Sequence, residues 1–442
     1  MNPVDVTPFT RRELLRGTFG AGAGAWLALN PALSWAADAV LSPTAEADWP
    51  AVAALMHRYV DAKKLAGIVS TFGWGKSPAQ MLTLGSGAMD QKQALDADSL
   101  FRIYSMTKPV TGLLTAMLID EGKLSLETKL ADICSEFSAM QVAIDPLVGL
   151  ESRAAAVPIT IRHLLTHTAG FGYASVGQEK VSAELLRRGL SPGAITRRKI
   201  AGVTSLVPTP AADDFLRETA KVPLVAEPGT VWRYSMSMDI LGLVLARHQG
   251  RPLGEILKER IFGPAGMTST FFQLPKAEIH RFTANYAIVK GKPFTLDKAK
   301  GSVFLDKQPF EYGGAGLVVS PRDFDRFMAL MLGEGVLDGR QLVSASAVRL
   351  AMSNLLPPGD VTKGTRMAGA GFGAGGRVGL GADEGSFGWS GAAGTLFFIQ
   401  RRIGLRAAMY TQFMPPQVYP VQQEFMAAAR ADALARLKRG AR

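Results

Sequence analysis

One stretch decides the fold of this 442-residue chain: Phe101-Arg102-Ile103-Tyr104-Ser105-Met106-Thr107-Lys108-Pro109-Val110. It contains the pattern Ser-x-x-Lys, and three residues of separation in a helix bring the hydroxyl of Ser105 and the amine of Lys108 onto one face. A serine hydroxyl is a weak nucleophile that needs a base, which a cleft lysine supplies if burial and nearby positive charge lower its pKa. At a helix start the nucleophile's own backbone N–H is also free to bind an oxyanion.

Ser-x-x-Lys alone is a weak signal, and its neighbours strengthen it. A strand-like run over 99–104 leads into the pattern, and apolar residues then continue as a helix to Leu118. The context favours a serine held between a strand and a buried helix.

Strand-like and helical segments stand at both ends of the chain. The predicted elements are a helix over 49–64 capped by Asp48, strands over 68–74 and 81–86, a β-hairpin of 394–400 and 405–413, and a helix over 421–438. The Gly-rich stretch 359–386 predicts an edge strand and a loop around a cleft. We therefore expect an α+β fold, with one antiparallel sheet built from both termini (40–104 and 313–442), flanked by helices, and a mainly helical lobe, 105–312, inserted between them.

The first residues resemble an export address. Arg11-Arg12 precede a weakly apolar, Gly/Ala-rich run over 17–36, which is typical of the bacterial route that exports folded proteins. Asn30-Pro31 make this run a poor transmembrane helix. We expect residues 1–36 to be a twin-arginine signal peptide, with the export machinery as partner, a periplasmic product and no stable membrane insertion after its removal. An ordinary amphipathic N-terminal helix is the alternative.

Composition excludes several classes of protein. With 47% hydrophobic and 20% charged residues the chain is an ordinary globular protein, not a disordered or multi-span membrane protein. The formal charge of +11 is scattered, and its densest groups have no interleaved aromatic platform, so nucleic acid is not an expected partner. A single cysteine, Cys134, excludes an internal disulfide and a multi-thiolate metal site, and we expect it to be buried.

The nucleophile stretch resembles the serine β-lactamase and penicillin-binding-protein superfamily, in particular the class C β-lactamase-like hydrolases and, among them, the family VIII carboxylesterases. Four further blocks resemble that branch in the expected order: Ile161-Arg162-His163-Leu164-Leu165-Thr166-His167-Thr168-Ala169-Gly170, Glu227-Pro228-Gly229 with Tyr234-Ser235, Gly313-Gly314-Ala315-Gly316-Leu317, and Trp389-Ser390-Gly391. The resemblance implies a β-lactamase/transpeptidase-like fold and neither a metal nor an organic cofactor.

The resemblance also implies a role for each motif residue. Ser105 would be the acylated nucleophile, and Lys108 and Tyr234 would share the general-base task, with lysine charge stabilising the tyrosine phenolate. The oxyanion hole would use the backbone N–H groups of Ser105 and Ala392, the residue after the third motif, Trp389-Ser390-Gly391.

Two departures from the β-lactamase pattern bear on the substrate. Met236 stands where β-lactamases carry an asparagine, and Trp389 stands where they carry a lysine or histidine. Both changes remove polar anchors and favour neutral carboxylic esters of small molecules. A β-lactamase or D-amino-acid peptidase of the same fold, and a catalytically inactive binding or sensor module, stay open as alternatives. We expect Asp239 to be a helix cap and the insertion 173–219 to line the acyl pocket.

Two rival motifs are present. His163 and His167 lie four residues apart and could face a metal, although a helix-packing or loop-anchoring role is favoured. Gly388-Trp389-Ser390-Gly391-Ala392 nearly matches a nucleophile elbow, but the strand-like run that follows argues against one, because a true elbow opens a helix.

Overall fold

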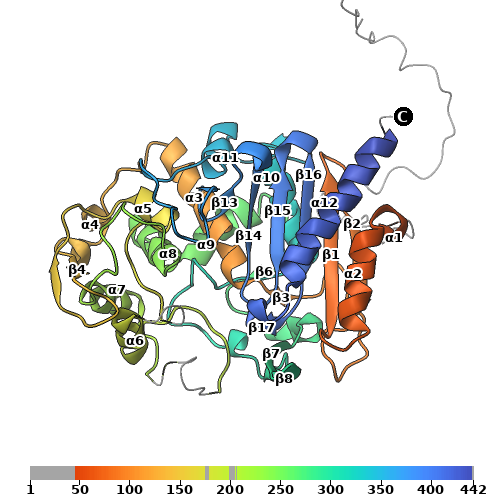
Figure 1. Ribbon diagram of the computed structural model, residues 1–442, viewed down its shortest axis with the longest axis horizontal. Coiled ribbons are helices and arrows are strands. Elements are labelled where there is room, and N and C mark those ends of the chain that lie inside the picture. The colour runs from red at the N-terminus through yellow and green to blue at the C-terminus, as the bar shows by residue number, and fades with distance from the viewer. Residues whose placement is uncertain (1–44, 175–178, 199–204, 206, 441–442) are drawn as a thin grey trace, which may run out of the picture. The chain divides into compact units, whose positions relative to one another are not determined.

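The computed structural model describes residues 45–174, 179–198, 205 and 207–440 (Figure 1). The predicted signal peptide lies outside these residues. In the described part, no helix combines the length and apolar composition needed to cross a membrane.

The α-helices of the described residues are α1 (Ala45–Asp48), α2 (Pro50–Val60), α3 (Thr107–Asp120), α4 (Leu130–Ile133), α5 (Ile161–Leu165), α6 (Lys180–Arg187), α7 (Ala212–Ala220), α8 (Ser237–Gln249), α9 (Leu253–Leu257), α10 (Pro321–Leu332), α11 (Ala345–Ala351) and α12 (Val421–Gly440). The strands are β1 (Gly67–Trp74), β2 (Gln80–Gly85), β3 (Phe101–Arg102), β4 (Gln141–Ala143), β5 (Ser152–Ala154), β6 (Thr270–Phe271), β7 (Asn285–Val289), β8 (Lys292–Asp297), β9 (Val318–Val319), β10 (Val336–Leu337), β11 (Arg340–Gln341), β12 (Gly371–Phe372), β13 (Arg377–Val378), β14 (Ser386–Ser390), β15 (Leu396–Gln400), β16 (Leu405–Tyr410) and β17 (Phe413–Met414).

A seven-stranded sheet joins the two ends of the described chain. Its strand order is β12-β13-β14-β15-β16-β1-β2, and neighbouring strands are antiparallel. The N-terminal strand β1 pairs with the C-terminal strand β16, with Val69 opposite Tyr410. The predicted antiparallel sheet from both termini is confirmed, and the Gly-rich stretch supplies the edge strand β12 and its neighbour β13.

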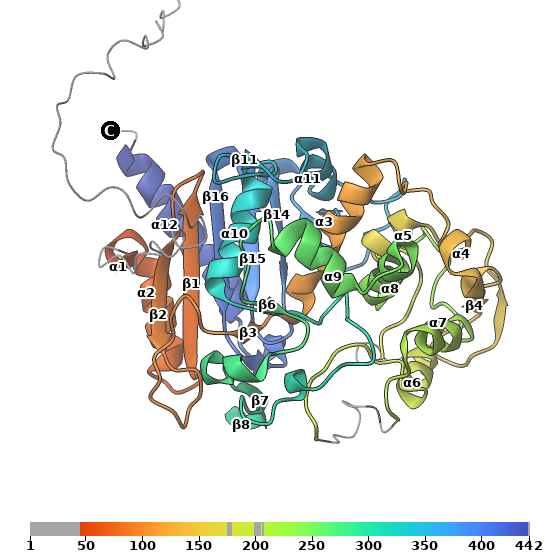
Figure 2. The same ribbon diagram turned by 180° about the vertical axis from the view of Figure 1, so that it is seen from behind.

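Helices cover both faces of this sheet (Figures 1 and 2). Successive side chains of a strand point to opposite faces, and β15 shows this directly. Phe398 meets Phe425 of α12 at 6.5 Å between ring centres, whereas Phe397 meets Phe324 of α10 at 5.1 Å. On the same face as α12, the ring of Trp49, the residue before α2, stacks on that of Phe72 in β1 at 3.8 Å between ring centres.

Two sequence predictions about helix α2 are wrong. Helix α2 ends at Val60 rather than at residue 64, and Lys63 then adopts a left-handed φ of 54°, which cannot continue a right-handed helix. Asp48 does not cap it, because the N-cap residue is Trp49 and makes no side-chain capping bond. The Asp48 carboxylate instead accepts hydrogen bonds from Gln80 and Arg436. These bonds connect the end of α1 to β2 and α12.

The segment 105–312 holds α3 to α9 and also β4 to β8. Three of these strands join the rest of the chain or one another: β6 pairs with β9, and β7 pairs with β17 and β8. The lobe boundaries at 105 and 312 stay a prediction. Cys134 is free and buried in the core of this segment, as expected.

Candidate active site

Ser105 lies in a single 3-10 turn, Tyr104–Met106, between β3 and α3. The strand is fixed by pairing with β9, and the backbone N–H of Ile103 extends this ladder to the carbonyl of Leu317 at 3.1 Å. Tyr104 has a left-handed φ of 40°, which is rare for a bulky residue. This turn redirects the chain from strand to helix and sets Ser105 at the start of α3.

The structure brings the three predicted catalytic side chains together. Ser105 Oγ lies 3.1 Å from Lys108 Nζ and 2.6 Å from Tyr234 Oη. Lys108 is fully buried, and its Nζ also donates to the carbonyl of Gly314 at 2.7 Å and lies 4.8 Å from the centre of the Tyr234 ring. The serine hydroxyl therefore faces a cationic donor and a phenol at once.

The third motif ends beside the segment that carries Ser105. Trp389 and Ser390 close strand β14, and a Cβ on Gly391 would collide with the carbonyl oxygen of Ile103. Only glycine permits this close approach of the two backbones. Among the described residues, the backbone N–H groups of Ser105 and Ala392 have no acceptor. The two backbone donors that the sequence analysis assigned to an oxyanion hole are thus without an acceptor, and their role there stays a prediction.

Gly314 links Lys108 to a buried carboxyl group. Its N–H donates to Asp239 Oδ1 at 2.9 Å while its carbonyl accepts from Lys108, and a Cβ on Gly314 would collide with Asp239. Burial raises the pKa of Asp239 to about 6, and the Lys108 charge opposes that rise. The expectation of a helix cap is wrong, because Met236 is the N-cap of α8 and Asp239 points inward from the first turn.

His167 holds the tyrosine segment in place. Its buried ring lies 4.7 Å from that of Tyr234, and its Nδ1 lies 3.2 Å from Ser235 Oγ. Burial, reinforced by two nearby cationic side chains, holds the pKa of His167 well below its usual 6.5, so the imidazole is neutral. His163 instead caps α5, accepting from the backbone N–H of Thr160 at 3.2 Å. The loop-anchoring role is confirmed, and no group of three metal-ligating side chains occurs in the described ranges.

Four aromatic side chains form a cluster that we call the aromatic wall: Trp232, Tyr234, Phe372 and Trp389. Trp232 and Phe372 are buried, so Tyr234 and Trp389 form its partly exposed face. The Trp389 ring lies 5.8 Å from Tyr234 and 5.2 Å from Phe372. Over this wall lies Arg366, whose Cζ is 4.9 Å from the ring centre of Tyr234. The sequence analysis placed the stretch 359–386 around a cleft but did not single out Arg366, because its ring partners are distant along the chain.

Two other sequence expectations resolve at this wall. Met236 is fully buried in the core, so it presents no side-chain surface to a substrate. Strand β14 continues into the hairpin strand β15, with Trp389 opposite Phe397. A nucleophile elbow at Ser390 is therefore excluded, since no helix follows it.

A cavity of about 230 Å³ lies against the predicted acyl-pocket insertion. Its lining includes Ala194 and Thr209 from the insertion and Tyr312 from the loop before Gly314. Ala194 belongs to the apolar cluster that also contains Tyr104. This cavity is thus connected by packing to the segment that carries the nucleophile.

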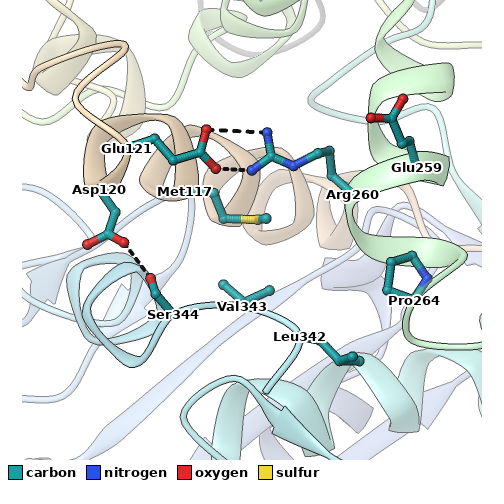
Figure 3. A pocket seen from close by; sticks show the side chains of 9 residues that line it. All are labelled: Met117, Asp120, Glu121, Glu259, Arg260, Pro264, Leu342, Val343 and Ser344. Carbon is teal, nitrogen blue, oxygen red and sulfur yellow. Dashed lines mark hydrogen bonds and ion pairs between the residues drawn. The ribbon is translucent and has the colours of Figure 1, made fainter. Parts of the chain in front are cut away.

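A second cavity, of about 360 Å³, lies at the far end of α3 (Figure 3). Its charged side chains are already paired: Glu121 with Arg260, and Asp120 with the Ser344 hydroxyl. Because a helix rises about 1.5 Å per residue, this end lies about 20 Å from Ser105. The second cavity is separate from the catalytic side chains.

Known proteins are similar to this chain in sequence and in fold. The profile of the family described as Beta-lactamase matches residues 52–431. The chain belongs to the beta-lactamase family. It is 30% identical over 359 residues to Protein Rv1367c of Mycobacterium tuberculosis (77% of this chain, 84% of that protein) and 30% identical over 338 residues to Esterase EstB of Burkholderia gladioli (71% and 77%).

The solved structures agree on the fold. EstCE1, "a hydrolase with promiscuous acyltransferase activity", superposes with a TM-score of 0.70 at 21% identity, covering 87% of this chain and 99% of EstCE1. The resemblance read from the motifs and the β-lactamase/transpeptidase-like α+β fold are both confirmed.

Proposed function

We propose that this protein is a serine hydrolase that cleaves carboxylic esters through an acyl-enzyme on Ser105. One observation carries the proposal: Ser105 Oγ lies within hydrogen-bond distance of both Lys108 Nζ and Tyr234 Oη, at the start of a helix. The esterase name of EstB, a relative at 30% identity, supports esters as the substrate class.

The first half of the reaction forms the acyl-enzyme. Tyr234, as a phenolate stabilised by the Lys108 charge, takes the hydroxyl proton of Ser105 while Oγ attacks the ester carbonyl carbon. The resulting oxyanion binds to the backbone N–H groups of Ser105 and Ala392. The C–O bond to the alcohol then breaks, and Tyr234 returns the proton to the leaving alkoxide.

The second half reverses these roles. Tyr234 takes a proton from water, the hydroxide attacks the acyl carbonyl, and the bond to Ser105 Oγ breaks as the serine regains the proton. The acid leaves and the site is restored. The aromatic wall favours an apolar substrate group beside the reacting carbonyl, because Trp389 offers area and no acceptor.

The insertion 173–219 is proposed to set the acyl length. Its described residues line the cavity of about 230 Å³ beside the nucleophile segment. Replacing Ala194, a small buried lining residue, by leucine is expected to shift the preference of p-nitrophenyl ester hydrolysis toward shorter acyl chains. An unchanged preference for acyl-chain length would contradict this part of the proposal.

The deciding test is a paired assay. Wild type and Ser105→Ala are offered p-nitrophenyl butyrate and a chromogenic cephalosporin, and both are treated with a fluorophosphonate probe. We expect ester turnover and probe labelling in wild type, both lost in the variant, with little cephalosporin cleavage. Strong cephalosporin turnover would favour the β-lactamase or peptidase alternative. A wild type silent to both substrates and to the probe would favour a binding module.

Acyl transfer is a second candidate outcome of the same intermediate. The apolar rings of the aromatic wall favour an alcohol over water as the group that attacks the acyl-enzyme, and EstCE1 is described as having promiscuous acyltransferase activity. Adding 1-propanol to the ester assay should give the propyl ester as a Ser105-dependent product.

Export is proposed from the sequence alone. We infer that residues 1–36 direct the folded protein to the periplasm through the twin-arginine machinery, as the Arg11-Arg12 pair and the weakly apolar run after it suggest. Replacing both arginines by lysine should keep the protein in the cytoplasmic fraction, whereas periplasmic recovery of that variant would contradict the proposal.

A further inference from the structure

Arg366 is a cation placed at the reacting centre without a counter-charge. Its Cζ lies 5.3 Å from the Trp232 ring centre, 4.9 Å from Tyr234 and 5.6 Å from Trp389. It is exposed, in the turn that precedes β12. Within the described residues, the contacts of this guanidinium are with these three rings, and none is with a carboxylate.

The contact with the rings leaves the hydrogen-bonding edge of Arg366 available. An aromatic ring attracts the guanidinium charge but offers its five N–H donors no oxygen or nitrogen acceptor. The wall therefore fixes the side chain and does not consume its donors. Planar N–H pairs of this kind match a carboxylate in a two-pronged contact.

The distances place this edge within reach of a bound ester. Tyr234 connects the two groups, since its ring lies under Arg366 and its hydroxyl touches Ser105 at 2.6 Å. With ordinary bond lengths, Arg366 Cζ lies within about 10 Å of Ser105 Oγ. That span fits a substrate whose ester carbonyl and carboxylate are separated by a few methylene groups.

We infer that Arg366 binds a carboxylate of the substrate, so that the preferred substrates are anionic esters rather than neutral ones. The inference rests on the proposed ester hydrolysis and names its substrate class. It changes the expectation drawn from Trp389, which removes the cation of the third motif. A cation returns to the site from a different segment of the chain, seated on that same tryptophan.

Matched esters test the inference. Monoethyl succinate and monoethyl glutarate are compared with ethyl butyrate and ethyl pentanoate, which carry a methyl group in place of the carboxylate, by following proton release at constant pH. Wild type, Arg366→Gln and Arg366→Lys are measured beside Lys363→Gln, which removes one exposed positive charge from the same turn.

We expect wild type to prefer the anionic ester of each pair, and Arg366→Gln to lower the anionic-to-neutral ratio of kcat/KM about tenfold or more, mainly through KM. Arg366→Lys should retain part of this ratio, since a lysine keeps the charge without the planar fork. Lys363→Gln should keep the wild-type ratio. Raising the salt concentration should lower the wild-type ratio but not that of Arg366→Gln.

Three results would overturn the inference. A ratio that Arg366→Gln leaves unchanged would exclude carboxylate binding, as would an equal shift in Lys363→Gln. An equal loss on both esters, seen in kcat, would show that Arg366 acts through Tyr234 instead. If wild type hydrolyses no ester at all, the proposed function fails. As a readout free of turnover, glutarate should bind more weakly to Ser105→Ala/Arg366→Gln than to Ser105→Ala in calorimetry.

Discussion

Two arginines flank the nucleophile, and they differ in how their charge is matched. Arg102, three residues before Ser105, is fully buried; its guanidinium lies 3.9 Å from the Phe282 ring centre and pairs with Asp297 at 2.5 Å. It also donates to the carbonyl of Thr283 at 2.6 Å. Arg366 likewise lies over aromatic rings, but it is exposed and has no carboxylate among the described residues.

The difference separates a structural charge from one available to a ligand. A buried charge must be matched inside the protein, because burial without a partner costs several kcal/mol. Arg102 meets that demand and fixes the strand before the nucleophile. Arg366, in contact with water, needs no internal partner, so its donors stay free for a substrate. Four substitutions test this difference.

Tyr234→Phe tests the proposed proton acceptor of Ser105, which lies below Arg366. Removing the hydroxyl that lies 2.6 Å from Ser105 Oγ should lower kcat of ester hydrolysis by about a thousandfold, because the proton acceptor is lost. The thermal midpoint should stay within a few degrees of wild type. Tyr59→Phe, which removes a hydroxyl bonded to Glu424 far from the site, is the control and should retain activity. A Tyr234→Phe enzyme of near wild-type kcat would contradict the mechanism.

Arg102→Met tests the buried ion pair of Arg102 and Asp297. It leaves the Asp297 carboxylate buried without its partner, and the free energy of unfolding should fall by about 3–5 kcal/mol. Urea unfolding followed by circular dichroism measures the loss. Arg102→Met/Asp297→Leu, which removes both charges, should recover part of it. A single variant as stable as wild type would show that the contrast between the two arginines is not one of charge matching.

Asp239→Asn tests the carboxyl group behind Lys108. Its pKa is about 6 in the folded protein and about 3.9 when unfolded. The folded state therefore holds the proton more tightly, and wild type loses stability as pH rises from 4 through 6. The asparagine variant does not ionise, so relative to wild type it should gain about 2 kcal/mol between pH 4 and pH 8. Urea midpoints at both pH values measure the difference, and a constant difference would refute it.

Glu384→Gln tests an exposed ion pair, for which we expect the smallest loss of stability. Glu384 pairs with Arg402 on the surface, where the two side chains are 64% and 58% exposed. Removing the pair should change the free energy of unfolding by less than about 1 kcal/mol, and less again in 0.5 M salt. A loss as large as that of Arg102→Met would mean that burial does not set the value of an ion pair here.

Much of the fold could be predicted because its signals are local. Strand β1 and the hairpin strands β15 and β16 are runs of apolar residues bounded by turns. The turn between β15 and β16 contains Gly404, whose left-handed φ of 67° favours glycine. Ser105 and Lys108 are three residues apart, so helical geometry alone predicts that they meet. Tyr234 was identified from family resemblance, since no local rule places it beside a residue 129 positions away.

The errors share one cause. Asp239 near the start of a helix has the pattern of a cap, and only the packing of Gly314 against it showed that the carboxyl points inward. Helix α2 was predicted too long because 61–64 has helical composition, while Lys63 turns left-handed. In both cases contacts with distant residues overrode a local preference.

The family, the antiparallel sheet built from both termini and the contact of Ser105 with Lys108 could all be predicted from the sequence, because they depend on recognisable motifs, on periodicity and on residues a few positions apart. Only the tertiary structure decided how charge is distributed around Ser105. Which arginine is matched inside the protein and which faces a substrate depends on partners that are distant in the chain. Arg102 meets Asp297, and Arg366 meets Trp389, only after the chain has folded.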